Sequence, residues 1–365
     1  MKNTQLKYTP LLSIHKDLSA RLGPFGGWMM PIQYRGIIAE HNWTRQSASL
    51  FDICHMGEFL LRARAEDISK DGVFTSSLSS IPVGSCRYGF ILNEAGGIVD
   101  DLVAYRMGED EWMFVVNAAT KDKDLAYLRL NLPSSVVIED ISDKTAKLDI
   151  QGPLSAVVLK AFAGERIDAL GYYRHGRFEL TGQDTVISRT GYTGELGFEI
   201  YVDRRLAAQL WQVILADERV RPAGLGARDT LRLEMCYPLY GQDIDETVTP
   251  LEAGFERFVD LKKDFLGKPA LLRQRCDGLR KRLAVFVSET RQSPRHGDRI
   301  YAEGKDVGFV TSGSFAPSLG IGIGMGYVEN GYDWIGARVL IKNERSKLPA
   351  KISDRPLYMK GTLRK

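Results

Sequence analysis

Residues 96–105, GGIVDDLVAY, constrain the fold most, because they predict a buried strand that carries two adjacent carboxylates. Neighbouring side chains of a strand point to opposite faces. Asp101 therefore shares a face with Val99 and Val103, and Asp100 occupies the other face. Both faces are otherwise apolar, so at least one carboxylate is expected to point into the protein interior. Burying an unpartnered carboxylate costs several kcal/mol, a large part of what folding leaves over, so the sequence predicts partners or a function for this pair.

The rest of the chain predicts an α+β protein of two or three domains. Its 365 residues exceed one ordinary domain, and 44% of them are hydrophobic, as in globular proteins. Helices and strands mix up to about residue 272, a polar and basic linker follows at 273–282, and short β segments fill 281–365. Helical spacing of apolar residues predicts helices at 8–23, 35–49, 121–132, 153–163 and 204–216.

Several classes of function lack their signatures. The 49 basic and 46 acidic residues give a net charge of +3, too balanced for a nucleic-acid binder. Residues 320–326, GIGIGMG, miss the dinucleotide-binding spacing and favour a strand with one glycine face, against which another backbone packs. The histidines show no metal-ligand spacing, so no metal is expected.

The compartment follows from the cysteines and the hydropathy pattern. Cys54, Cys86, Cys236 and Cys276 form no CxxC pair and indicate free thiols in a reducing compartment. The N-terminal segment has no apolar signal-peptide core, and no stretch approaches the ~20 apolar residues of a membrane span. We expect a cytoplasmic protein that does not enter a membrane.

Two further charged residues lie in ordered segments. Alternation in the strand near 197–202 puts Glu199 on the face opposite its apolar neighbours. Arg228 lies in the first turn of a helix, where a cation opposes the positive end of the helix dipole, so we expect an acceptor nearby. Asp229 and Glu234 on the same helix are the alternative partners.

Nine motifs occur together in one order, at residues 9–11, 25–34, 51–56, 93–102, 116–119, 148–153, 189–200, 224–234 and 311–320. From about residue 8 to Tyr358 the chain thereby resembles the glycine cleavage system T-protein (aminomethyltransferase) family. The departures are few: Cys54 stands in place of serine, Leu196 in place of an acidic or amide residue, and residues 235–237 in place of a smaller run. None of them removes a folate contact, but each lies where donor specificity is set.

The resemblance implies a fold of three domains in a cloverleaf around a central funnel for tetrahydrofolate. It divides the chain into one α+β domain of residues 1–52 and 138–243, and a second of 53–137 and 244–276. Residues 277–365 form a C-terminal β-barrel or jelly-roll domain.

The resemblance also implies the reaction. The enzyme takes the aminomethyl group from the lipoyl arm of the H-protein, releases ammonia and forms 5,10-methylenetetrahydrofolate. A tetrahydrofolate-dependent demethylase of the same fold is the nearest alternative. A folate-binding protein of iron–sulfur assembly is a weaker one, since its Lys-Gly-Cys-Tyr-x-Gly-Gln-Glu motif is absent. The folate domain of a flavin-dependent dehydrogenase would need a flavin domain for which the chain has no room.

The site residues follow position by position. Asp101 matches the carboxylate beside the reacting nitrogens of folate, where it orients the folate, stabilises developing positive charge and helps proton transfer. Asp100 is the structural member of the pair. A carboxylate matches the two donors of the pterin edge and a guanidinium its acceptor, which assigns Glu199 and Arg228. The remaining folate-pocket positions are Tyr88, Asn117, Tyr192, Met56, Tyr358 and Arg295, the last with three alternatives: folate glutamate binding, H-protein docking or structural pairing.

Overall fold

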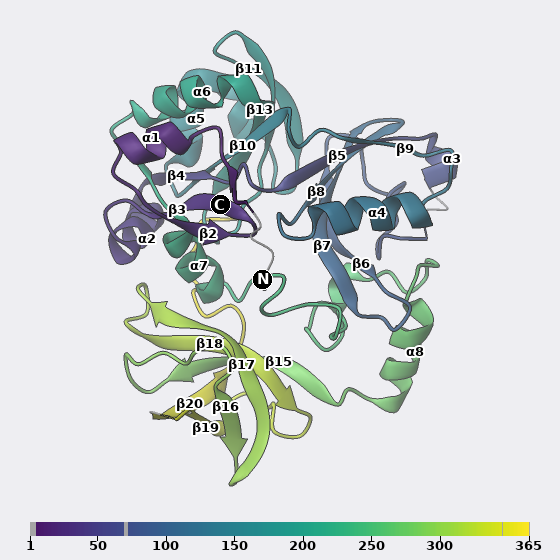
Figure 1. Cartoon of the computed structure of the whole chain (residues 1–365), viewed down its shortest axis with the longest axis vertical. Coiled ribbons are helices and arrows are strands. Elements are labelled where there is room, and N and C mark those ends of the chain that lie inside the picture. The colour runs from purple at the N-terminus through teal and green to yellow at the C-terminus, as the bar shows by residue number, and fades with distance from the viewer. Residues whose placement is uncertain (1–4, 69–71, 345, 365) are drawn as a thin grey trace.

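The computed structural model describes residues 5–68, 72–344 and 346–364. Figure 1 shows three lobes around the middle of the view: a six-stranded sheet with helices at the upper left, a five-stranded sheet at the right and a β-barrel below. This arrangement, mixed α and β with a closed barrel at the C-terminal end, confirms the predicted fold class.

The first lobe is built on a sheet in the order β11-β12-β13-β10-β4-β14. Its strands are β4 (Ala48–Asp52), β10 (Thr145–Gln151), β11 (His175–Leu180), β12 (Gln183–Ser188), β13 (Gly197–Asp203) and β14 (Val220–Pro222). A small sheet adds β1 (Lys7–Tyr8), β2 (Arg21–Phe25) and β3 (Trp28–Gln33). The helical segments are α1 (Leu12–Asp17), α2 (Ile37–Gln46), α5 (Ser155–Ala163), η1 (Glu165–Ala169), η2 (Arg204–Leu206), α6 (Ala207–Leu215) and α7 (Leu225–Glu234).

Both faces of the six-stranded sheet are buried. Phe198, Ile200 and Val202 of β13 point into the main core with α5 and α6, as the predicted alternation requires. On the other face, Tyr201 packs against Tyr105 of the five-stranded sheet, and the two hydroxyls are 2.9 Å apart. Glu199 therefore lies where two lobes meet.

The second lobe carries the predicted strand with two aspartates. Its sheet has the order β6-β7-β8-β5-β9, formed by β5 (Gly57–Arg62), β6 (Cys86–Leu92), β7 (Ile98–Gly108), β8 (Glu111–Val116) and β9 (Val137–Asp140). Its helical segments are α3 (Ala65–Ile68), α4 (Lys121–Asn131), η3 (Glu256–Phe258) and α8 (Lys268–Asp277).

The third lobe is a closed barrel in the order β15-β18-β17-β16-β19-β20. Its strands are β15 (Lys281–Ser288), β16 (Arg299–Ala302), β17 (Lys305–Ala316), β18 (Ile321–Glu329), β19 (Arg338–Lys342) and β20 (Lys347–Ser353). The glycine face predicted for residues 320–326 lies on β18. A Cβ at Gly322 or Gly326 would lie 2.0 or 2.4 Å from the carbonyl oxygens of Gln292 and Phe309, so other backbone does pack there.

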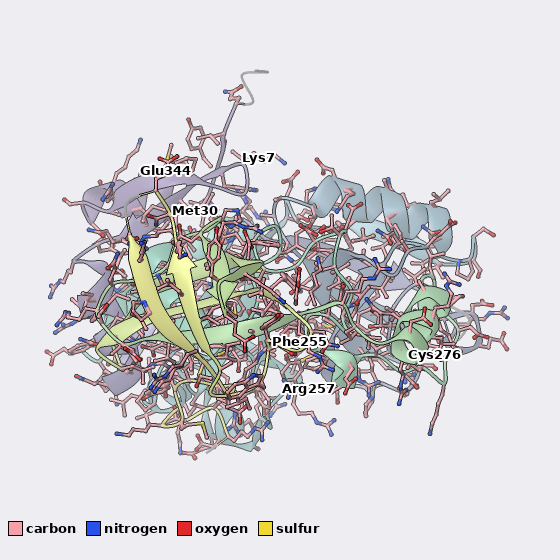
Figure 2. The ribbon with its side chains drawn as sticks, turned by 90° about the horizontal axis from the view of Figure 1, so that it is seen from below. Lys7, Met30, Phe255, Arg257, Cys276 and Glu344 are labelled. Carbon is pink, nitrogen blue, oxygen red and sulfur yellow. The ribbon has the colours of Figure 1, made fainter. Side chains whose placement is uncertain are left out.

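A segment that follows the first lobe in sequence fills the space between the second lobe and the barrel. Seen from below in Figure 2, Phe255 and Arg257 lie between the barrel strands on the left and α8 with Cys276 on the right. Phe255 belongs to an apolar cluster with Phe90 of β6 and Tyr327 of β18. This cluster joins the second lobe to the barrel.

Most predicted helices are present, but two predictions were wrong. The helix expected at 8–23 is only Leu12–Asp17, because Ser19 has a positive φ of 56° and the chain continues as β2. The linker predicted at 273–282 was too long: these residues are the end of α8, a short connection at 278–280 and the start of β15. The domain boundaries at 52, 137, 243 and 276 stay a prediction.

The turn before β7 is tightly packed, and a substitution at Gly97 tests this packing. A Cβ at Gly97 would lie 1.9 Å from the carbonyl oxygen of Glu246, which is backbone and cannot move aside cheaply. We expect Gly97→Ala to lower the free energy of unfolding by about 1–3 kcal/mol, as overpacking does. Denaturant titration measures this. Gly108→Ala is the control, since its Cβ would meet only Glu111 Cβ at 3.8 Å; equal losses in the two variants would contradict the packing argument.

Candidate functional site

The two aspartates of β7 point to opposite sides and have different partners. Asp100 is fully buried and accepts hydrogen bonds from Thr120 Oγ1 at 3.0 Å and from the side chain and backbone of Asn117 at 2.9 and 3.2 Å. Asp101 accepts from Tyr88 Oη at 2.9 Å and from Asn117 Nδ2 at 2.8 Å. The Asn117 amide therefore bridges the pair and fixes Asp101 relative to Asp100.

The environment makes Asp101 titrate near neutrality. Burial, followed by the charge of Asp100, raises the pKa of Asp101 to about 7, while the bonds from Tyr88 and Asn117 oppose the shift. Burial and the neighbouring Asp124 raise the pKa of Asp100 well above its usual range. A carboxyl group with a pKa near 7 is suited to proton transfer at physiological pH.

Glu199 lies on β13 among four protein donors and is only 6% exposed. One oxygen, Oε1, forms an ion pair with Lys147 Nζ at 3.0 Å. The other, Oε2, accepts from Thr190 Oγ1 at 2.6 Å and from Tyr105 and Tyr201 at 3.2 and 3.4 Å. Burial is the largest influence on Glu199 and would raise its pKa, but the charges of Lys147 and Arg228 and the hydrogen bond from Thr190 together outweigh it, so the pKa lies below its usual value.

Arg228 finds its acceptor on another element. Its Nη1 donates to Asp149 Oδ2 of β10 at 2.5 Å, so neither alternative on its own helix is its partner. Asp229 pairs with Arg232, and Glu234 pairs with Arg45. The need for an acceptor was thus predicted correctly, but not its source.

Tyr192 connects Arg228 with Asp101. The Arg228 guanidinium carbon lies 5.0 Å from the centre of the Tyr192 ring, and the Tyr192 hydroxyl donates to the Pro238 carbonyl. Burial raises the pKa of Tyr192, and the negative charge of Asp101 adds to the shift. Asp101 and Arg228 therefore both act on this one tyrosine.

Met56 completes the group on the side of Glu199. Its sulfur lies 3.6 Å from Lys147 Nζ, and its side chain packs against the apolar cluster around Tyr105. The structure thus brings together seven of the predicted residues, which we call the site cluster: Met56, Tyr88, Asp101, Asn117, Tyr192, Glu199 and Arg228.

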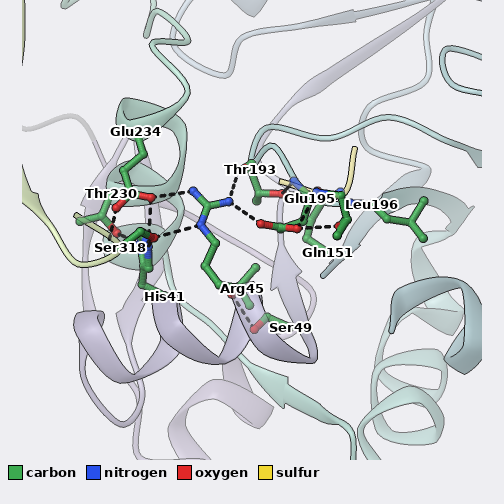
Figure 3. A network of polar contacts seen from close by, with 12 residues as sticks. His41, Arg45, Ser49, Gln151, Thr193, Glu195, Leu196, Thr230, Glu234 and Ser318 are labelled. Atoms are coloured by element: carbon green, nitrogen blue, oxygen red, sulfur yellow. Dashed lines mark hydrogen bonds and ion pairs between the residues drawn. The ribbon is translucent and has the colours of Figure 1, made fainter. Parts of the chain in front are cut away.

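Tyr358 and Arg295 have other surroundings. Tyr358 stacks on Arg45, whose guanidinium carbon lies 3.9 Å from the ring centre. Figure 3 shows Arg45 between two carboxylates, Glu195 at 2.9 Å and Glu234 at 2.8 Å, in a network that also holds His41 and Ser318. Arg295 is exposed on the barrel, where it donates to the Gly313 carbonyl at 3.3 Å.

Four buried charged or polar groups around the cluster were not predicted from the sequence. Lys147 and Asp149 alternate along β10, a period-2 signal that the residues 147–151, KLDIQ, already carry. Among the residues that the structure describes, His55 Nδ1 and Glu58 Oε1 find no hydrogen-bond partner, and both atoms are buried. Burial lowers the pKa of His55 to about 4 and raises that of Glu58 to about 8.

The match to family models decides the family. Residues 11–263 match the GCVT N-terminal domain, and residues 281–358 match the glycine cleavage T-protein C-terminal barrel domain. The chain belongs to the glycine cleavage T-protein family. The second match coincides with the closed barrel, and the first covers the part of the chain that holds both sheets.

Relatives of this T-protein family cover nearly the whole chain. A protein of Thermosynechococcus vestitus named aminomethyltransferase is 42% identical over 97% of this chain and 96% of its own. One of Halothermothrix orenii with the same name is 44% identical over 88% and 92%. The crystal structure of glycine cleavage system aminomethyltransferase T from Bartonella henselae superimposes with a TM-score of 0.92, at 33% identity over 98% of this chain and 99% of that one.

These comparisons confirm the predicted family and enzyme class, a one-carbon transferase of the aminomethyltransferase type, and do not favour the demethylase alternative. None of the helices that the structure describes is long and apolar enough to cross a membrane. Within the described ranges, no group of three or more His, Cys, Asp or Glu residues could hold a metal ion.

Proposed function

We propose that the protein accepts the aminomethyl group of the lipoyl arm of the glycine cleavage H-protein, releases ammonia and forms 5,10-methylenetetrahydrofolate. The observation that carries the proposal is Asp101, a carboxyl group with a pKa of about 7 held by Tyr88 and Asn117 beside the aromatic and charged groups of the site cluster. We further propose that the protein works in the cytoplasm, where the lipoylated H-protein is its partner.

The residues of the site cluster fit tetrahydrofolate. A pterin presents two adjacent donors and one acceptor on its edge, for which a carboxylate and a guanidinium are the matching groups. Glu199 is held ionised, and Arg228 uses one nitrogen on Asp149, which leaves further N–H groups for an acceptor. Tyr88 and Tyr192 add ring surface beside Asp101.

Bound tetrahydrofolate supplies the nitrogen nucleophile that takes the one-carbon unit. Asp101 orients it, stabilises the positive charge that develops on the transferred carbon and exchanges a proton with the reacting groups. The apolar surroundings of β7 exclude water and strengthen these electrostatic effects. Tyr88 and Asn117 position the Asp101 carboxylate through their hydrogen bonds.

We assign Tyr358 and Arg295 to the periphery of the proposed folate site. The exposed guanidinium of Arg295 suits the glutamate carboxylates of folate or an acidic surface of the H-protein. Tyr358 lies on Arg45 and packs the C-terminal segment onto the first lobe.

The pKa of Asp101 gives a pH prediction. If the ionised carboxylate is the active form, kcat/KM rises with pH through an apparent pKa of about 7 and falls about tenfold per pH unit below it. The steady-state rate of methylenetetrahydrofolate formation between pH 5.5 and 8.5 measures this limb. A profile that stays flat below pH 7 would contradict the role of Asp101.

A further inference from the structure

Strand β10 places two charges directly beside the proposed pterin-binding pair. Asp149 lies opposite Glu199 in the antiparallel register of β10 and β13, and Lys147 lies opposite Tyr201. Two carboxylates opposite each other on adjacent strands repel. The cations Lys147 and Arg228 compensate this repulsion, so the four groups form a neutral quartet of two acids and two bases.

Each member of the proposed pterin-binding pair is anchored at one end. Lys147 Nζ is 3.0 Å from Glu199 Oε1, and these side chains are only 2% and 8% exposed. Asp149 Oδ2 holds Arg228 Nη1, while Asp149 Oδ1 accepts from Gln151 Nε2 at 2.6 Å. Both anchors are therefore fixed by the sheet itself.

The anchors leave donors of Arg228 unused, whereas Glu199 Oε2 is also held by Thr190 Oγ1 at 2.6 Å. In the described part of the chain, Nε and Nη2 of Arg228 have no hydrogen-bond partner, and the side chain is 14% exposed beside the Tyr192 ring. On Glu199, the contacts from Tyr105 and Tyr201 at 3.2 and 3.4 Å are long and weak, and an incoming donor can replace them.

We propose that Lys147 and Asp149 are positioning residues for the folate: Lys147 keeps Glu199 ionised and oriented toward the pterin donors, and Asp149 orients Arg228 toward the pterin acceptor. This inference rests on the proposed function. It deepens that function by assigning recognition of the pterin edge to four side chains in place of two. Because the quartet is neutral, it selects a ligand by its donor and acceptor pattern, and not by net charge.

Other titratable groups around Glu199 enter the pH test. The acidic and basic ones are Lys147, Arg228, Glu58 of β5 and Asp149, whose pKa burial raises to about 6. The hydroxyl and thiol groups Cys86, Tyr105, Tyr173 and Tyr201 also face it, and burial raises the pKa of each well above its usual range, so they keep their protons. Burial raises the pKa of Glu58 to about 8, so the test includes a Glu58→Gln background.

The test measures tetrahydrofolate binding by anaerobic isothermal titration calorimetry between pH 6 and 9, with the unfolding temperature recorded for each protein. We expect Lys147→Met to raise Kd about tenfold or more at pH 7, the scale of one charge-assisted hydrogen bond, and to recover affinity toward pH 9 as Glu199 ionises. The same recovery is expected in the Glu58→Gln background. Lys147→Arg should restore Kd to within a few-fold of the wild-type value.

Asp149→Asn is nearly isosteric and tests the second anchor by itself. We expect its Kd to rise about tenfold with no recovery at high pH, because the orientation of Arg228 and not a protonation state is lost. Lys144→Met is the matched control, since Lys144 just precedes β10 but forms an exposed pair with Glu139. Its Kd should match the wild type.

The possible results distinguish a failure of the proposed function from a failure of the positioning role. A wild-type protein that does not bind tetrahydrofolate contradicts the proposed function itself. A wild type that binds, with Asp149→Asn and Lys147→Met showing the same Kd and pH profile but a lower unfolding temperature, overturns the positioning role and leaves the quartet purely structural. If Lys147→Met does not fold, the Kd of Asp149→Asn decides.

Discussion

Replacing Asp101 with asparagine is expected to preserve the fold and much of the folate affinity while lowering turnover by at least ~10²-fold, the scale of one electrostatic or acid–base contact. Asparagine keeps the shape of the side chain and an oxygen that Tyr88 can donate to, so β7 and its partners stay in place. It removes the negative charge and the exchangeable proton. Single-turnover formation of methylenetetrahydrofolate separates this loss from changes in binding.

Asp100→Asn is the matched control for that experiment. Asp100 points to the other side of the strand, where burial and Asp124 favour its protonated form, so a neutral amide resembles what is already present. We expect turnover within a few-fold of the wild type. Near-normal turnover of Asp101→Asn, or an equal loss in both variants, would contradict the division of roles between the two aspartates.

The largest expected loss of stability comes from Arg232 on α7. Its side chain is 1% exposed and donates to Asp243 at 2.6 Å and to Ser312 of the barrel at 2.8 Å, so it ties the first lobe to the third. Arg232→Met leaves the buried Asp243 without its cation, which costs about 3–5 kcal/mol. Denaturant-induced unfolding followed by tryptophan fluorescence measures the change.

Arg299→Met is the control for the loss of one positive charge. Arg299 pairs with Asp306, but the two side chains are 51% and 37% exposed. Exposed pairs contribute at most about 1 kcal/mol, so we expect a small loss. A similar loss in both variants would show that Arg232 does not tie α7 to the barrel.

The alternation of side chains along a strand was sufficient to predict features that depend only on neighbouring residues in the chain. Alternation placed Asp100 and Asp101 on opposite faces and Glu199 opposite its apolar neighbours, and both assignments agree with the observed contacts. The glycine face of β18 also followed from the period of two. Such patterns require no knowledge of which strands pair.

The contacts that could not be predicted from the sequence depend on which elements pair in the tertiary structure. Asp149 of β10 and Arg228 of α7 are 79 positions apart in sequence, and only the tertiary fold brings them into contact. Nothing near Arg228 in the chain indicates that partner, and the local alternatives were already engaged elsewhere. The helix prediction for the start of the chain failed for a local reason. The spacing of apolar residues extended this helix to residue 23, but the positive φ of Ser19 ends it earlier.

The most direct test is an assay of the purified protein with tetrahydrofolate and aminomethyl-lipoyl H-protein, with ammonia and methylenetetrahydrofolate both quantified. The proposed function predicts that both products form in equal amounts with the wild type and at least ~10²-fold more slowly with Asp101→Asn. No turnover with this donor, together with 5-methyltetrahydrofolate formed from a sulfonium or aryl methyl ether, would contradict it.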